Sequence, residues 1–187
     1  MSGADLYTLP PGLPVPEDDG AAGHLPGTML PQLTLESSQG PVSLRELSLE
    51  RLVLYVSPRP GRPGEPTPPE WDAIPGARGC TPQSCAFRDH AAELEGLGAK
   101  VAGLSAQSLE EQLEFAERNH IPYPVIADPE CRLGRALRLP TFEFGRVTLY
   151  KRITLVVDAC AISKVFYPVF PPDKNADEVV AWLRERA

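Results

Sequence analysis

Residues 52–56 read Leu-Val-Leu-Tyr-Val, and Ser57 and Pro58 end the run. A continuous apolar run of this length, closed by a turn signal, is typical of a strand that is covered on both faces of a sheet. We therefore place this strand at the centre of the sheet. The chain on either side of it must then supply the helices that cover the strand and the further strands that pair with it.

Downstream of this run, apolar residues at helical spacing alternate with short apolar strands. We expect helices over about 81–97, 108–116, 130–137 and 175–183, and strands over 100–106, 124–127, 153–157 and 162–167. Ser108 and Glu111 form a capping box at the start of the second helix. Upstream, the alternating segment from Leu30 to Leu47 predicts a short hairpin. Together these elements indicate an α/β domain with a mixed central sheet flanked by helices.

The composition excludes several classes of protein. The chain has 187 residues, close to the size of one compact domain, and no uninterrupted apolar run approaches the roughly 20 residues of a membrane-spanning helix. The formal net charge of −7 disfavours a nucleic-acid backbone as a partner. The first 44 residues contain no Lys or Arg and no long apolar stretch, so we expect no secretory signal and a cytoplasmic protein.

Two proline-rich segments interrupt the pattern. Residues 1–27 combine five prolines with an acidic cluster and predict a flexible arm, which leaves residues 28–187 as the domain. Residues 57–79 contain seven prolines and four glycines and form a loop of about 20 residues. Connections between a strand and a helix usually have only about 2 to 6 residues. Trp71 lies in this proline loop. We expect it to anchor the loop, the alternative being that it folds the loop onto a pocket.

Two of the four cysteines, Cys80 and Cys85, lie five positions apart at the predicted start of a helix. The unpaired amides and the dipole of a helix N-terminus favour a thiolate at Cys80. An ideal helix separates the two Cα atoms by about 8.6 Å, whereas a disulfide tolerates about 4.4 to 6.8 Å. The pair can therefore join only if the first helical turn unwinds, which predicts a redox switch. The alternative is two small apolar residues at a helix start.

A metal site is a weaker interpretation of the same cysteines. The chain has three histidines, and none stands at the spacing of paired metal ligands. A domain of this size also does not need disulfides as permanent crosslinks. We therefore expect no metal and no cofactor.

The segment from Gly79 to Asp89, Gly-Cys-Thr-Pro-Gln-Ser-Cys-Ala-Phe-Arg-Asp, closely resembles the active-site segment of peroxiredoxins of the bacterioferritin-comigratory-protein type. The usual sequence motif of that family is Thr-Pro-Gly-Cys-Thr, followed by a second cysteine and then by Phe-Arg-Asp. Residues 31–35 and 152–158 resemble two further family segments. The resemblance therefore covers most of the chain from about Leu30 and leaves out the arm and the proline loop. It implies a thioredoxin-like fold, which is consistent with the predicted order of elements.

The resemblance also implies an activity, that of an atypical two-cysteine peroxiredoxin. Cys80 would be the peroxidatic cysteine, whose thiolate attacks hydrogen peroxide or an organic hydroperoxide and becomes a sulfenic acid. Cys85 would be the resolving cysteine, and thioredoxin or a similar dithiol protein would reduce the resulting intramolecular disulfide. Arg152 would hold the peroxide and the thiolate, the alternative being a salt-bridged surface arginine. Because both cysteines lie in one chain, we expect a monomer.

The chain departs from the family pattern Pro-x-x-x-Thr-x-x-Cys. Counting back from Cys80 places Ala77 at the threonine position and Ala73 at the proline position, so the threonine hydroxyl is missing. Either the loop from Ser57 supplies another donor, such as a backbone amide of Gly79 or Cys80, or turnover is slow. Two rival functions therefore stay open: a thiol-disulfide oxidoreductase without peroxidase activity, and a thioredoxin-fold scaffold whose arm and loop bind proline-recognising partners.

The remaining candidates match no functional residue of the family. We expect Cys131 and Cys160 to be spectators, with Cys160 exposed enough to oxidise because it follows a predicted turn. Arg88 and Asp89 are expected to pair locally. Arg78 either adds positive potential beside Cys80 or is simply solvated.

Overall fold

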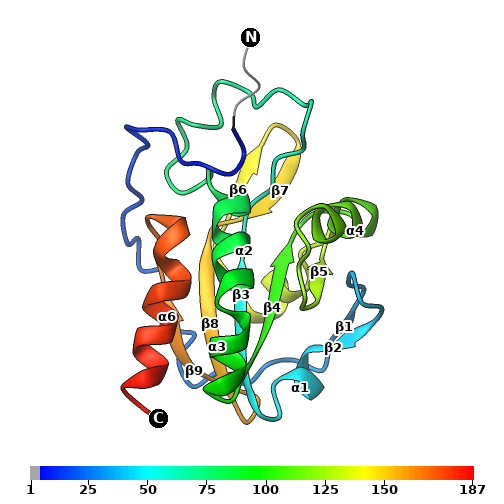
Figure 1. Cartoon of the computed structure of the whole chain (residues 1–187), viewed down its shortest axis with the longest axis vertical. Coiled ribbons are helices and arrows are strands. Elements are labelled where there is room, and N and C mark those ends of the chain that lie inside the picture. The colour runs from blue at the N-terminus through cyan, green and yellow to red at the C-terminus, as the bar shows by residue number, and fades with distance from the viewer. Residues whose placement is uncertain (1–4) are drawn as a thin grey trace.

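The computed structural model describes residues 5–187, and its centre is a five-stranded sheet (Figure 1). In spatial order the strands are β5 (Val125–Ala127), β4 (Ala99–Ser105), β3 (Arg51–Val56), β8 (Ile153–Asp158) and β9 (Ala161–Phe166). β3 pairs in parallel with β4 and antiparallel with β8. The prediction that residues 52–56 form the central strand of a mixed sheet is therefore confirmed.

Helices cover both faces of this sheet, as the alternation of strands and helices predicts. One face packs against α2 (Cys80–Asp89), α3 (Ala91–Gly96), α4 (Leu109–Arg118) and α6 (Asn175–Arg184), and the other against α1 (Leu44–Leu47) and α5 (Arg132–Leu137). The predicted capping box of α4 is present, with Ser108 and Glu111 each accepting a hydrogen bond from the backbone N–H of the other. The upstream hairpin is also confirmed, as β1 (Thr34–Leu35) and β2 (Val42–Ser43).

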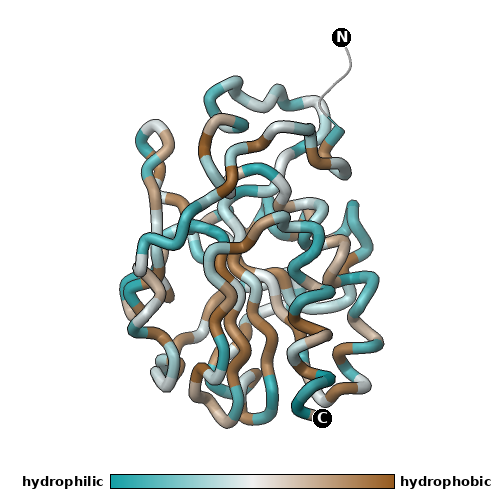
Figure 2. The backbone as a smooth tube through the Cα atoms, turned by 90° about the vertical axis from the view of Figure 1, so that its left-hand side faces the viewer, coloured by the Kyte–Doolittle hydropathy of each residue, from teal (hydrophilic) through white to brown (hydrophobic). Residues whose placement is uncertain are grey.

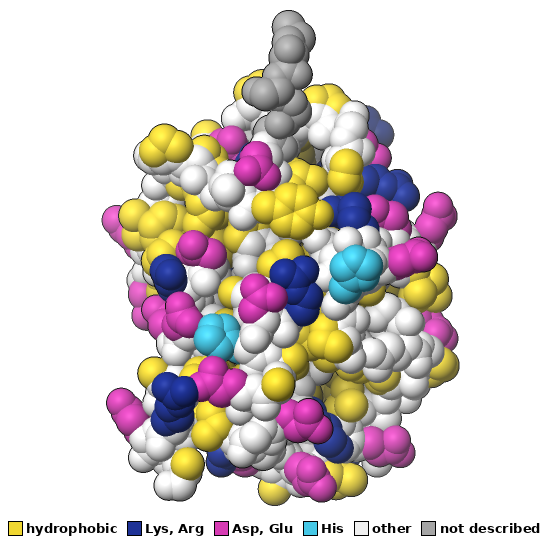
Figure 3. Space-filling view, viewed as in Figure 1, with side chains coloured by type: hydrophobic (Ala, Val, Ile, Leu, Met, Phe, Trp, Pro, Cys, Tyr) yellow, Lys and Arg dark blue, Asp and Glu magenta, His cyan; other side chains and the backbone are white. Residues whose placement is uncertain are grey.

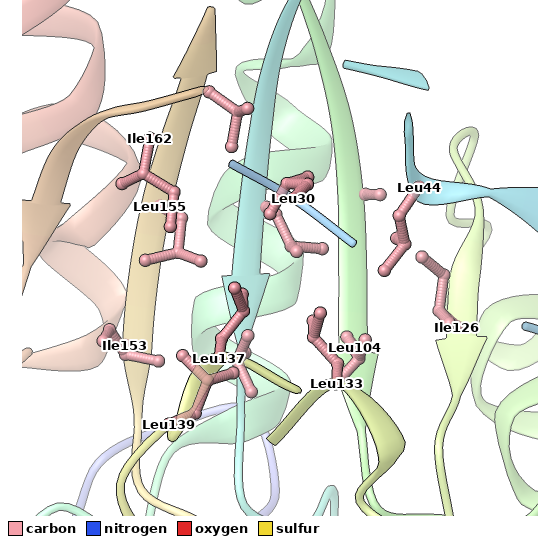
Figure 4. Packing of buried hydrophobic residues seen from close by; sticks show 14 of the residues in the cluster. Leu30, Leu44, Leu104, Ile126, Leu133, Leu137, Leu139, Ile153, Leu155 and Ile162 are labelled. Carbon is pink, nitrogen blue, oxygen red and sulfur yellow. The ribbon is translucent and has the colours of Figure 1, made fainter. Parts of the chain in front are cut away.

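The side chains of β3 enter two apolar layers, because successive side chains of a strand point to opposite faces. Val53 and Tyr55 pack against the layer of α2, α3, α4 and α6. Leu52, Leu54 and Val56 pack in the opposite layer, where Leu30, Leu104, Leu133 and Leu155 also lie (Figure 4). Hydrophobic residues accordingly follow the strands through the middle of the molecule (Figure 2). Burial on both faces explains why residues 52–56 carry no charged side chain, whereas Arg51 at the start of the strand is only half-buried.

Three elements differ from the sequence-based expectation. The helix expected over 81–97 is interrupted at His90, which separates α2 from α3. A hairpin of β6 (Thr141–Phe144) and β7 (Val147–Tyr150) was not expected. A short 3₁₀ helix, η1 (Pro172–Lys174), precedes α6, and the Asn175 side chain does not cap that helix but is buried in the protein interior.

The last residues of the expected arm, residues 1–27, belong to the core of the domain. Leu25 is fully buried and Ala22 nearly so, and both belong to the same apolar layer as Leu30. The backbone N–H of Gly27 donates to the carbonyl oxygen of Ile162 at 2.7 Å. Residues 20–27 are thus packed with the domain, while residues 5–19 run along its surface. The flexibility of the arm stays a prediction.

The proline loop, the first described residues of the arm and the start of α2 lie together at one end of the molecule, and the rest of the arm runs down its side (Figure 1). The loop leaves the carboxyl end of β3 and returns to the sheet through α2. The arm contacts this loop, since a Leu6 methyl group occupies the space beside the Cα of Gly61. Within residues 5–187, no helix is both long and apolar enough to cross a membrane.

Candidate active site

Cys80 is the first residue of α2, as predicted, and it is 2% exposed. The preceding residue, Gly79, has φ of 105°, a backbone conformation that side chains with a Cβ rarely adopt. A Cβ at this position would also collide with Pro172 and Leu9. Glycine is therefore required to turn the chain into α2. Because no side chain caps the helix, its first amides stay free to interact with a negative charge.

Two N–H donors point at the sulfur of Cys80. Nη2 of Arg152 lies 3.3 Å from Sγ, and the backbone N–H of Arg59 in the proline loop also donates to Sγ at 3.3 Å. The thiol in turn lies 3.8 Å from the carbonyl oxygen of Ala77. A positive guanidinium and a peptide N–H both stabilise a negatively charged sulfur. The site is thus suited to hold Cys80 as a nucleophile.

Arg152 is 3% exposed, so the alternative of a salt-bridged surface arginine is wrong. Its guanidinium donates to Oε1 of Gln83 at 2.5 Å and to the carbonyl oxygens of Ala77 and Arg78 at 3.1 and 3.2 Å. Throughout residues 5–187, no carboxylate forms an ion pair with it. The acceptors are neutral, which leaves the Cys80 sulfur as the group that can balance the buried charge.

A buried polar chain that the sequence analysis missed positions Gln83. Nε2 of Gln83 donates to Oδ1 of Asn175 at 3.1 Å, and Thr154 Oγ1 donates to the same oxygen at 2.7 Å. All three residues are fully buried. A threonine within the apolar run of β8 was the available signal, because a buried hydroxyl needs a partner. This chain connects α2, β8 and α6 directly behind Arg152.

Cys85 lies on the same helix as Cys80, and both are free thiols. It is partly exposed, with Sγ 3.9 Å from Oδ1 of Asn119. Partial burial raises the pKa of the Cys85 thiol above its ordinary value. The first turn of α2 is intact, since the N–H of Gln83 donates to the carbonyl oxygen of Gly79 at 3.1 Å. The structure therefore represents the reduced protein, with Cys85 protonated at neutral pH.

Ala77 has no hydroxyl, and a backbone group of the proline loop donates to the Cys80 sulfur. Ala77 is buried and offers only its carbonyl to the site. The donor that reaches Sγ is the N–H of Arg59, not an amide of Gly79 or Cys80 as the sequence suggested.

A pocket opens on Cys80 between the arm and the proline loop, with a free volume of about 60 Å³. Leu6 of the arm and Pro66, Pro68 and Trp71 of the loop supply apolar walls, and Arg59 and Arg78 lie among the polar ones. In the space-filling view, hydrophobic side chains gather with Lys and Arg on the same upper part of the molecule (Figure 3).

Trp71 both anchors the loop and lines this pocket. It is 6% exposed, and its ring packs edge-on against Phe144 with centroids 5.1 Å apart. A second, tilted contact joins it to Phe142 at 6.1 Å. The unexpected hairpin of β6 and β7 therefore fixes one wall of the pocket.

The other sequence candidates occupy defined positions. Arg78 is not simply solvated, because it donates to Oδ1 of Asp72 at 3.0 Å and to the backbone carbonyl of Asp5 at 3.2 Å. The expected pair of Arg88 and Asp89 is present at 3.0 Å.

Neither remaining cysteine approaches the pocket. Cys160 is 5% exposed, so the expectation that it could oxidise at an exposed turn is wrong. Its turn packs beneath α1, where the N–H of Cys160 donates to the carbonyl oxygen of Ser48 at 2.8 Å. Cys131 precedes α5 and is also buried, and burial raises the pKa of its thiol.

Comparisons with known proteins agree with this arrangement. Residues 73–164 match the model of the AhpC/TSA family. The chain is 30% identical over 176 residues to a chloroplastic peroxiredoxin Q of Sedum lineare, with 93% of this chain and 86% of the relative covered. For the corresponding protein of Gentiana triflora the identity is 31% over 186 residues, covering 96% and 78%. Among solved structures, peroxidoxin BcpB from Mycobacterium tuberculosis has a TM-score of 0.71 at 25% identity, covering 88% of this chain and 99% of that one.

Proposed function

This chain belongs to the peroxiredoxin Q family, and from that premise we propose that Cys80 is the sulfur that reacts with peroxide. The protein is a thiol peroxidase with a thioredoxin-like fold. The observation that carries the assignment of Cys80 is its position at the start of α2, where Arg152 and the Arg59 N–H both donate to Sγ at 3.3 Å. No other cysteine of the described chain has a donor pair of this kind.

In the first step, the Cys80 thiolate attacks the terminal oxygen of the hydroperoxide. A sulfur–oxygen bond forms, the O–O bond breaks, and the departing oxygen leaves with a proton as water or an alcohol. Negative charge moves from sulfur to the departing oxygen during this step. The guanidinium of Arg152 and the N–H of Arg59 stabilise that charge because both are fixed before the reaction begins. Cys80 remains as a sulfenic acid.

In the second step, Cys85 attacks the sulfenic sulfur, a disulfide forms and water leaves. The helix must first unwind locally, since an intact helix keeps the two Cα atoms about 8.6 Å apart. Two features favour this unwinding: no side chain caps α2, and Cys85 is already partly exposed. The raised pKa of the Cys85 thiol keeps it from competing for peroxide in the folded state.

A dithiol protein of the thioredoxin type then reduces the disulfide. The cycle needs only the two thiols of one helix, so we propose that a monomer is active and that no metal or cofactor takes part. Because both thiols must be reduced at the start of each cycle, we place the protein in a reducing compartment, the cytoplasm.

Mass spectrometry after one equivalent of hydrogen peroxide tests this assignment. We expect an intramolecular disulfide between Cys80 and Cys85, no reaction in Cys80→Ser, and a sulfenic acid in Cys85→Ser. Cys160→Ser is the matched control and should behave as the wild type. A free Cys85 beside a stable sulfenic acid on Cys80 in the wild type contradicts the resolving role. Reduction of insulin without peroxide turnover contradicts the peroxidase role.

A further inference from the structure

The two segments that lie outside the family resemblance meet above Cys80. Leu6 of the arm packs against Gly61 of the proline loop so closely that a Cβ at residue 61 would lie 2.5 Å from Leu6 Cδ2. A larger residue at position 61 would displace the Leu6 side chain. The arm and the loop therefore form one side of the pocket together, and neither segment encloses it alone.

Polar contacts on both sides of Leu6 hold it in this position. The carbonyl oxygen of Asp5 accepts from Nη2 of Arg78 at 3.2 Å, and the Tyr7 hydroxyl lies 3.4 Å from Nη1 of Arg118. Nη2 of Arg118 also donates to the carbonyl oxygen of Gly61 at 3.2 Å. Arg118 thus connects the arm, the loop and α4, and Leu6 is directed into the pocket between these contacts.

The pocket is larger than hydrogen peroxide requires. Its free volume is about 60 Å³, and on this measure one water needs about 10 to 15 Å³. The space therefore holds about four to six non-hydrogen atoms, whereas hydrogen peroxide has two. The remaining space faces Leu6, Pro66, Pro68 and Trp71, side chains that offer an apolar surface. An apolar group attached to the peroxide would replace water there and gain contact energy.

We propose that Leu6 determines substrate specificity and that it selects hydroperoxides with a compact alkyl group. The hydroperoxide group lies at Cys80, and the alkyl group contacts Leu6 and Trp71, which line the same pocket. tert-Butyl hydroperoxide, with six non-hydrogen atoms, is the representative substrate. This proposal rests on the proposed reaction at Cys80 and assigns the arm a part in it.

The test compares rate constants for oxidation of Cys80 by tert-butyl hydroperoxide and by hydrogen peroxide. In Leu6→Ala we expect the constant for tert-butyl hydroperoxide to fall about tenfold, the usual effect of losing a small apolar contact in a binding pocket. The constant for hydrogen peroxide should stay within about twofold, because that substrate does not reach the wall. Leu6→Met, which conserves volume, should restore most of the loss. Val15→Ala changes an exposed arm residue outside the pocket and is the control.

The outcomes separate this proposal from the proposed function. An equal fall for both peroxides in Leu6→Ala means that Leu6 supports the site without selecting substrate, and it overturns the proposal. Unchanged constants for both peroxides overturn it as well. Failure of wild-type Cys80 to react with hydrogen peroxide overturns the proposed function itself, and the specificity proposal falls with it.

Discussion

At the scale of single residues, the Cys80 sulfur receives one donor from a charged side chain and one from the peptide backbone. Arg152 lies on the chain directly before β8, whereas the N–H of Arg59 belongs to a loop that starts at the end of β3. A peptide N–H cannot be removed by changing the side chain. It can be removed by proline, which has no backbone N–H.

We therefore expect Arg59→Pro to slow the reaction of Cys80 with hydrogen peroxide by about 100-fold, the effect of losing one fixed donor to a developing negative charge. Arg59→Ala keeps the N–H and should stay within about threefold of the wild type. Stopped-flow measurement of Cys80 oxidation gives both constants, and circular dichroism checks that each variant is folded. Equal rates in the two variants would show that the side chain or the loop shape, and not the N–H, matters.

The sequence predicted the side chains of the site better than its backbone. Cys80 and Arg152 could be predicted to lie together because each belongs to a short segment that resembles the family, whereas the resolving role of Cys85 stays a prediction. The Arg59 N–H lies 21 positions before Cys80, and a backbone donor has no residue type that marks it. The expected helix over 175–183 begins at Asn175, but the sequence does not show that this side chain faces Thr154 and Gln83.

At the scale of elements, a single carboxylate joins β5, α5 and β7. Asp128 is fully buried and accepts hydrogen bonds from the N–H groups of Arg132 and Leu133 at 2.8 and 2.9 Å. The Tyr150 hydroxyl donates to the same carboxylate at 2.7 Å. These bonds satisfy the first amides of α5, which would otherwise lack partners.

We expect Asp128→Ala to lower the free energy of unfolding by about 3 kcal/mol, because two amides and a hydroxyl lose their buried acceptor. Tyr150→Phe removes one donor to the carboxylate and the acceptor of the Gly134 N–H, but it leaves the amides of Arg132 and Leu133 paired, so it should cost about 2 kcal/mol. Urea unfolding followed by circular dichroism measures both values. A loss in Asp128→Ala no larger than that in Tyr150→Phe would mean that water or another group replaces the carboxylate at α5.

The missed hairpin shows how an element can escape a sequence-based prediction even when its signal is present. Residues 141–144 read Thr-Phe-Glu-Phe, an alternating pattern, and Gly145 follows at the turn. Such a pattern predicts a strand. We missed it because its apolar side chains, Phe142 and Phe144, do not enter the central sheet but pack against Trp71 in the proline loop. The hairpin packs against the proline loop, for which the sequence predicted no helix or strand.

At the scale of the whole molecule, the surface part of the arm is attached to the domain at a few charged and apolar contacts. Asp19 pairs with Nζ of Lys151 at 2.8 Å and accepts from the Tyr167 hydroxyl, also at 2.8 Å. These hydrogen bonds hold the pKa of Asp19 below its usual value. A carboxylate with a lowered pKa keeps its contribution at neutral pH and loses it only on acidification below the ordinary range.

Hydrogen exchange tests how firmly this contact holds the arm. In Asp19→Asn, which keeps the shape and removes the charge, we expect amides within residues 5–19 to exchange faster at neutral pH. Amides of β3 and β8 should be unaffected, because they lie in the centre of the sheet. Lys164→Ala changes a lysine on β9 with no carboxylate partner among the ion pairs of the described chain and serves as the control. Unchanged exchange in residues 5–19 would show that the apolar contacts alone secure this segment.

The crowding around Gly79 has a consequence for the timing of the catalytic cycle. Leu9 and Pro172 both fill the space next to its Cα, and Pro16 lies beside Gly76 three positions earlier. If the two sulfurs join as proposed, the backbone at Gly79 has to part from these neighbours before Cys85 can arrive. The lifetime of the sulfenic acid then depends on Leu9 and Pro16, which lie more than sixty residues before Cys80 in sequence. During that lifetime a second peroxide molecule can oxidise the sulfur further.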